Sequence, residues 1–232
     1  MKKIGIIGAM ELEVDTLKKD MVMEKKISKA GMEFCEGTLK GTKVVVVKSG
    51  IGKVNAALCV QILSDLFQVT NVINTGVAGS LNPELNIGDI LVSTIALQYD
   101  MDATHFGYPM GEIPQMGITE FPANEKMASL AIETCTQLFP EITARKGRVV
   151  TGDRFVAEDE VKEMLINDFH GDCCEMEGGA IAHGAYLNNI PFVILRAISD
   201  KADGTAEMDY PTFERESAKR CAILVENLVG KI

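Results

Sequence analysis

The sequence alternates short apolar segments with amphipathic ones along its whole length, and this pattern restricts the fold more than any other feature. Segments 4–8, 69–74, 89–97, 146–150 and 191–198 are apolar runs of strand length. Helical spacing of apolar residues occurs in segments 11–19, 53–67, 126–138, 158–167, 174–188 and 210–229. Nearly continuous apolar strands that alternate with helices predict a largely parallel sheet covered on both faces.

A β-hairpin is predicted for residues 32–49, where two strand-like runs flank a turn at Gly41 and Thr42. The hairpin makes the predicted sheet mixed. No linker, repeat or low-complexity segment interrupts the chain. We therefore expect one three-layer α/β domain over residues 1–232, with a mixed, mostly parallel central sheet flanked by helices. In the segment 53–67, the prediction places Val54, Leu58, Ile62 and Leu66 on one helical face.

Composition excludes several classes of protein. The net charge is −10 and no basic stripe occurs, which argues against nucleic-acid binding. No run approaches about 18 apolar residues, so no membrane span is expected, and the apolar start of the chain meets Glu11 and Glu13 too early for a signal peptide. Six cysteines without a C-x-x-C pair, beside three histidines, predict reduced thiols of a cytoplasmic protein and no metal site.

Small and polar residues follow the predicted strands at segments 8–10, 49–52, 75–79, 151–153 and 199–200. Ligands of open α/β sheets bind beyond the carboxyl ends of the strands, so these segments predict a small-ligand site. The Gly50–Lys53 turn lacks the glycine and hydroxyl residue of a phosphate loop, because Val47 and Val54 stand there. A tight strand-to-helix turn is the simpler interpretation.

Charged residues near these strand ends have two interpretations. Arg196 lies inside an apolar strand, where a charge is costly unless it is paired. It either forms an internal ion pair or lies with Asp200 beside a ligand. Glu175 and Glu177 precede a glycine pair at the start of a predicted helix. They either favour the positive end of the helix dipole or form one wall of a tight pocket.

Six segments together carry a resemblance that spans nearly the whole chain: GIIGAMELEV, VKSGIGKVNAA, NTGVAG, TGDRF, EMEGGAIAH and LRAISDKAD. In this order and spacing they closely resemble the 5′-methylthioadenosine/S-adenosylhomocysteine nucleosidases of the nucleoside phosphorylase superfamily. The resemblance implies a single α/β domain, a homodimer and hydrolysis of the adenine–ribose bond of thio-nucleosides. It implies no cofactor and no metal.

The resemblance also implies roles for individual residues. Glu13 matches the acid that activates the attacking water, and Asp200 matches the acid that donates to adenine N7. Glu177 matches the carboxylate that binds the ribose hydroxyls. Phe106 and Pro114 match residues lent to the neighbouring subunit's pocket. The other substrate-binding positions it implies are Met10, Ile51, Val77, Ala78, Gly79, Phe155, Val156, Glu175, Met176, Arg196, Ser199 and Tyr210.

Two positions depart from the family pattern. Some members have a hydroxyl residue where Val77 stands, and phenylalanine is frequent where Tyr210 stands. The proposed chemistry remains physically sound, since breaking an N-glycosidic bond builds positive charge on the sugar and negative charge on the leaving base. Carboxylates near the sugar and a proton donor at the base stabilise these charges.

Three alternatives stay open at this stage. A purine nucleoside phosphorylase needs cations to hold phosphate, whereas the first glycine loop here carries Glu11 and Glu13. A nucleosidase for 6-amino-6-deoxyfutalosine would use the same site. A non-catalytic nucleoside-binding protein would not need Glu13 beside the sugar. The order of preference among methylthioadenosine, S-adenosylhomocysteine, 5′-deoxyadenosine and the futalosine derivative does not follow from the sequence.

Overall fold

The computed structural model describes residues 2–200 and 210–232, with side chains from Glu214 onward in the second range. Its elements, in chain order, are β1 (Ile4–Gly8), α1 (Glu11–Asp20), β2 (Val22–Lys29), β3 (Met32–Leu39), β4 (Thr42–Lys48), α2 (Lys53–Asp65), β5 (Asn71–Ser80), β6 (Ile90–Gln98), the 3₁₀ helix η1 (Thr104–Phe106), β7 (Phe121–Pro122), α3 (Glu125–Leu138), β8 (Ala144–Thr151), α4 (Asp159–Asn167), β9 (Cys173–Glu175), α5 (Gly178–Leu187), β10 (Phe192–Asp200) and α6 (Tyr210–Leu228).

One ten-stranded sheet runs through the molecule in the order β10-β6-β8-β9-β5-β1-β4-β3-β2, with β7 on β6. Among the described residues, five strand pairs are parallel and five antiparallel. The mixed sheet is confirmed, although its antiparallel share is larger than expected. Because β10 pairs with both β5 and β6, and β9 with both β5 and β8, five strands close into a ring.

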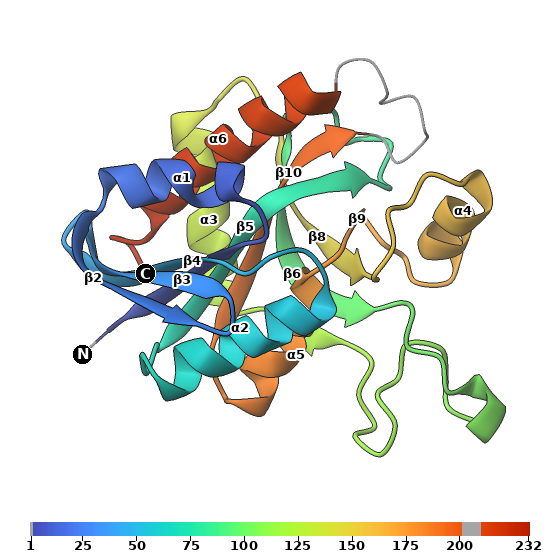
Figure 1. The fold of residues 1–232 in the computed structure, drawn as a ribbon. Helices are drawn as coiled ribbons and strands as arrows, with labels where there is room; N and C mark the ends of the chain where they lie inside the picture. Colours follow the sequence, from blue (N-terminus) through green and yellow to red (C-terminus); the bar gives the residue numbers. More distant parts are fainter. Residues whose placement is uncertain (1, 201–209) are drawn as a thin grey trace.

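Two helical layers cover the sheet, with α1, α3 and α6 on one face and α2 and α5 on the other (Figure 1). The side chains of β4 alternate between the two cores. Val44 and Val46 pack under α1 and α6, whereas Val45 and Val47 pack toward α2. Side chains of a strand point alternately to its two faces, so a strand covered on both faces is apolar throughout. The predicted single three-layer α/β domain is therefore confirmed.

Three strands, β2, β7 and β9, escaped the sequence prediction, and β7 has only two residues. β2 is an edge strand paired with β3, and all but one of its residues are exposed, so it has no apolar alternation to reveal it. β9 was expected to be the opening of a helix. It is instead a strand that pairs with both β5 and β8, and α5 begins only at Gly178. Pairing across the sheet overrides the local helical pattern there.

Other boundaries differ in smaller ways. β5 continues through residues 75–80, beyond the predicted end of the strand at Asn74. The turn of the hairpin is centred on Lys40 and Gly41, both with positive φ, one residue earlier than predicted. On α2 the predicted apolar face is mostly exposed, with Val54 71% and Leu58 47% accessible, while Cys59 and Leu63 face the core. None of the described helices combines the length and hydropathy needed to cross a membrane.

Candidate active site

The carboxyl ends of β1, β4, β5, β9 and β10 border one cavity of about 290 Å³. This volume is at the lower end of the range for small-ligand pockets. The cavity lies where the rule for α/β sheets predicts it. Twelve of the residues implied by the resemblance line it: Met10, Glu13, Ile51, Val77, Ala78, Gly79, Phe155, Glu175, Met176, Glu177, Ser199 and Asp200.

The remaining predicted residues have other positions. Val156 lines a smaller adjoining hollow. Arg196 lies behind the cavity wall, almost fully buried. Phe106 and Pro114 lie between β6 and β7 and do not line the cavity of this chain, and Phe106 is 79% exposed. Tyr210 begins α6, but its side chain lies outside the described residues.

Three further residues, Ala9, Cys174 and Glu214, line the cavity and were missed by the sequence analysis. Ala9 lies within a glycine-rich turn that was already a candidate, so its neighbours could have indicated it. Cys174 was interpreted only as a buried thiol. No sequence motif around Glu214 indicates a site residue, because only the packing of α6 against the sheet brings it to the cavity. Ser217 contributes to that packing by donating a hydrogen bond to Ile198 O at 3.1 Å.

Glu13 is a buried carboxylate held by backbone amides. Its Oε2 atom accepts hydrogen bonds from Ala9 N at 2.6 Å and Met10 N at 2.9 Å, and its Oε1 atom accepts one from Val77 N at 3.2 Å. Burial raises the pKa of this carboxyl, while Arg196 and the backbone donors oppose the rise. Glu13 is therefore a fixed proton acceptor with increased basicity beside the cavity.

Glycine at position 76 makes room for this arrangement. A Cβ atom at Gly76 would lie 2.6 Å from Glu13 Oε1 and in contact with Arg196 Nη1. Glu13 and Arg196 therefore approach each other across the bare backbone of β5. The glycine is needed for space, since its φ is not in the left-handed region.

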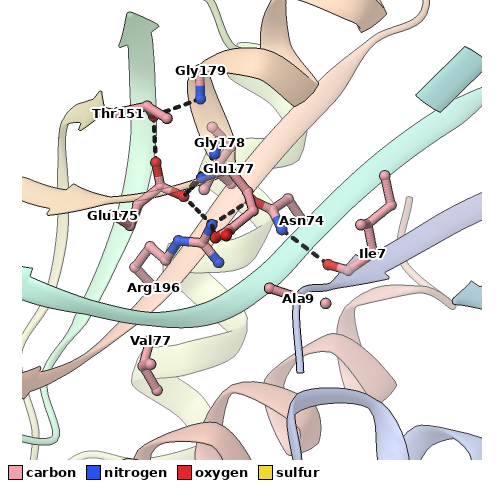
Figure 2. Close-up of polar contacts among 12 residues, drawn as sticks. Ile7, Ala9, Asn74, Val77, Thr151, Glu175, Glu177, Gly178, Gly179 and Arg196 are labelled. Carbon is pink, nitrogen blue, oxygen red and sulfur yellow. Dashed lines mark hydrogen bonds and ion pairs between the residues drawn. The ribbon is translucent and has the colours of Figure 1, made fainter. Parts of the chain in front are cut away.

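Arg196 forms the internal ion pair that was one of the two interpretations of its position. Its Nη2 atom donates to Glu175 and, at 2.7 Å, to Asn74 Oδ1, and it lies 3.8 Å from Glu177 Oε2 (Figure 2). Asn74 in turn donates to Ile7 O at 3.0 Å. Burial lowers the pKa of the guanidinium, but the nearby carboxylates outweigh burial and raise it. Arg196 therefore stays charged and compensates the acids around it.

Glu177 is a second buried carboxylate that lines the cavity. Its Oε1 atom accepts a hydrogen bond of 2.8 Å from Gly52 N at the start of α2. Gly52 has φ of 96°, which only glycine adopts readily. Burial and the charge of Glu175 raise the pKa of Glu177 to about 7, against the opposing effect of Arg196. The glycine-rich turn before α2 thus binds an internal carboxylate.

Asp200 ends β10 beside Gly79 of β5. It is buried, and Ser199 Oγ donates to its Oδ1 atom at 2.8 Å. No Lys, Arg or His side chain is among the described residues that line the cavity. In the described part of the chain, no group of three or more His, Cys, Asp or Glu side chains is arranged to hold a metal ion. The cavity therefore presents carboxylates and apolar surface to a bound molecule.

Comparison with known proteins identifies the relatives of this fold and site. A model of the phosphorylase superfamily matches residues 3–230. A 5′-methylthioadenosine/S-adenosylhomocysteine nucleosidase of Staphylococcus aureus is 41% identical over 230 residues, which cover 99% of this chain and all of the relative.

Solved structures agree with these sequence matches. The nucleosidase of the same name from Colwellia psychrerythraea 34H, in complex with adenine, is 38% identical with a TM-score of 0.94, over 99% of this chain and 95% of that one. A futalosine hydrolase of Helicobacter pylori strain 26695 is 33% identical with a TM-score of 0.93, over 100% and 98%. The chain therefore belongs to the phosphorylase superfamily and, within it, to the family of the 5′-methylthioadenosine/S-adenosylhomocysteine nucleosidases.

Proposed function

We propose that this protein hydrolyses the N-glycosidic bond of 5′-methylthioadenosine and S-adenosylhomocysteine, releasing adenine and the 5-thioribose product. Glu13 takes a proton from the attacking water. Asp200 donates a proton to adenine N7 as the base leaves. Glu177 binds the ribose hydroxyls, and the charge of the carboxylates stabilises the cationic sugar in the transition state.

The observation that carries the proposal is the environment of Glu13. A carboxylate with raised pKa is a better base than an exposed one, and three backbone amides hold this one beside the cavity. Asp200 lines the same cavity as Glu13. A base for water and a donor for the leaving group are the two groups that hydrolysis requires.

Water is a better candidate for the nucleophile than phosphate. A phosphate dianion needs cationic or amide donors. The described lining carries five acids (Glu13, Glu175, Glu177, Asp200 and Glu214) and no basic side chain. Arg196 lies behind the wall, and its Nη2 atom is engaged by Glu175 and Asn74. The acids of the lining would repel an anionic nucleophile such as phosphate, whereas they would not repel neutral water.

The test is adenine release from 5′-methylthioadenosine, followed by chromatography in buffer without phosphate and again with phosphate added. We expect adenine and free methylthioribose in both buffers at the same rate. Release that requires phosphate and yields a sugar 1-phosphate would overturn the hydrolase. No release in either buffer would favour a nucleoside-binding protein.

A second substrate class has specific support. The Helicobacter pylori structure named as a futalosine hydrolase covers the whole of this chain with a TM-score of 0.93. A nucleosidase acting on 6-amino-6-deoxyfutalosine would use the same acids. Parallel assays of adenine release from this compound, S-adenosylhomocysteine and 5′-methylthioadenosine rank the candidates. We expect the two thio-nucleosides to give the higher kcat/KM.

We also propose that the protein is a homodimer, with Phe106 and Pro114 of one subunit closing the cavity of the other. Large exposed apolar side chains support this, because α2 and α5 pack side by side and carry Val54, Leu58, Tyr186 and Leu187 on their outer surface. Sedimentation of the wild type and a Val54→Glu variant tests the interface. We expect a dimer that the charge dissociates, and a wild-type monomer would contradict the proposal.

The remaining parts of the proposal concern the domain organisation, the cellular compartment and the metabolic role of the protein. We propose that residues 1–232 act as a single catalytic domain in the cytoplasm and that the reaction serves methionine salvage. All six cysteines are free and buried, which supports a reducing compartment. Cell fractionation and growth on 5′-methylthioadenosine as the sulfur source test these two assignments.

A further inference from the structure

The backbone amides at the start of α5 donate to side chains other than that of the N-cap residue. Helices begin with backbone N–H groups that lack partners within the helix, and the N-cap side chain usually accepts from them. Glu177 is the N-cap residue of α5, but its side chain does not cap the helix. Its carboxylate accepts instead from the backbone N–H of Gly52, the N-cap residue of α2. Other residues must therefore satisfy the amides at the start of α5.

Glu175 satisfies two of them. Its Oε2 atom accepts hydrogen bonds from Glu177 N at 3.1 Å and from Gly178 N at 2.7 Å. The same carboxylate binds Arg196 through Nη2. Glu175 thus joins the start of α5 to the buried arginine of β10.

Thr151, at the end of β8, satisfies the next amide. Its Oγ1 atom accepts a hydrogen bond of 2.6 Å from Gly179 N and donates to Glu175 Oε1 (Figure 2). The Thr151 side chain is fully buried, and it is absent from the cavity lining. A Cβ atom at Gly179 would lie 2.9 Å from Thr151 Oγ1, so this close contact requires glycine.

These contacts explain why two acids stand two residues apart before a glycine pair. The Glu177 side chain does not cap the helix that it precedes. Here Glu175 and Thr151 cap α5, which leaves the Glu177 carboxylate directed at Gly52 and the cavity. From the resemblance Glu175 was expected to bind substrate, yet protein donors contact both of its carboxylate oxygens.

We propose that Thr151 and Glu175 are positioning residues, whose hydrogen bonds together hold the Glu177 carboxylate and the Arg196 guanidinium on the ribose side of the site. This inference rests on the proposed function, which assigns the ribose to Glu177. The hydrogen bonds of Thr151 and Glu175 lead to the start of α5 and to Arg196, whereas the proposed function assigns the purine to Asp200. Loss of the Thr151 hydroxyl should therefore weaken recognition of ribose and leave recognition of the base intact.

The experiment compares two ligands by isothermal titration calorimetry on the full chain. Adenine reports the purine side alone, and 5′-methylthiotubercidin reports purine and ribose together. For Thr151→Val we expect the nucleoside analogue to bind about tenfold or more weakly and adenine to bind within about twofold of wild type. Thr151→Ser keeps the hydroxyl and should restore both affinities. Thr136→Val is the control, since Thr136 bonds only within α3 on the surface.

Steady-state kinetics give a second readout. We expect Thr151→Val and Glu175→Gln to lower kcat/KM for 5′-methylthioadenosine, and Thr151→Ser to retain it. Glu175→Gln keeps the side-chain shape, so it provides the test if the valine variant does not fold. Equal losses for adenine and the nucleoside analogue in both variants, or no loss for either, would overturn the inference. A wild-type protein that binds neither ligand would instead overturn the proposed function.

Discussion

The cavity is lined by two buried carboxylates, Glu13 and Glu177, which are held in different ways. Glu13 receives hydrogen bonds from three backbone amides, two of them at the start of its own helix. Glu177 receives one, from Gly52, which is 125 residues away in sequence, and it lies 3.8 Å from Arg196. Burial raises the pKa of both.

The difference shows two ways of keeping an acid inside a protein. Arg196 and three fixed amide dipoles stabilise the charge of Glu13, and the amides do not titrate. Glu177 depends on its neighbours Glu175 and Arg196, so its charge is linked to theirs. We therefore expect substitutions at Glu13 to act mainly on the rate, and changes around Glu177 to act on binding and pH dependence.

The largest effect is expected for Glu13→Gln. The amide keeps the shape of the side chain but cannot accept a proton, so we expect kcat to fall about 10³-fold with little loss of 5′-methylthiotubercidin binding. Kinetics and calorimetry on the same sample measure both. Glu11→Gln is the control, because Glu11 is exposed and pairs with Lys18. A variant with wild-type turnover would contradict the role of Glu13, and a wild type without turnover would favour a binding protein.

An intermediate effect is expected from the pH dependence of Glu177. Its pKa is about 7 in the folded protein and 4.5 in the reference state, so folding favours the protonated form. The stabilising contribution of that proton is present below pH 4.5 and is lost as the pH rises to 7. The loss is at most about 3 kcal/mol.

Denaturant unfolding of wild type and Glu177→Gln at pH 5 and pH 8 measures this contribution. We expect wild type to lose free energy of unfolding relative to the variant between the two values. Affinity for 5′-methylthiotubercidin should change in the opposite direction in wild type, because the ionised carboxylate is the better acceptor for ribose hydroxyls. Parallel stability curves for the two proteins would contradict the raised pKa.

The smallest effect is expected for Gly76→Ala, which crowds Glu13 and Arg196 where they approach across β5. The added methyl would lie 2.6 Å from Glu13 Oε1 and in contact with Arg196 Nη1, so both side chains must move. We expect a loss of about 1–3 kcal/mol in the free energy of unfolding and a reduced kcat. Gly230→Ala is the matched control, since nothing lies within 4 Å of a Cβ atom there. Equal free energies of unfolding for the two variants would show that the close approach of Glu13 and Arg196 across β5 does not affect stability.

Local sequence patterns predicted those elements and motifs whose formation depends on residues close to one another in the sequence. The apolar runs of β1, β4 and β10 and the helices between strands follow from periodicity. The candidate acids Glu13 and Asp200 could be proposed because they follow strand ends in recognisable motifs. The prediction was wrong for β9, whose three residues become a strand only because β5 and β8 lie on either side.

By itself, the sequence determined the α/β class, the layers and the strand-end location of the cavity, since these follow from which residues avoid water. Only the tertiary structure decided which groups meet. The contacts of Thr151 with Gly179, of Gly52 with Glu177 and of Arg196 with Asn74 join residues 28 to 125 positions apart. Hydrogen bonds at such separations depend on the register of the strands and the approach of the helices, which no local pattern encodes.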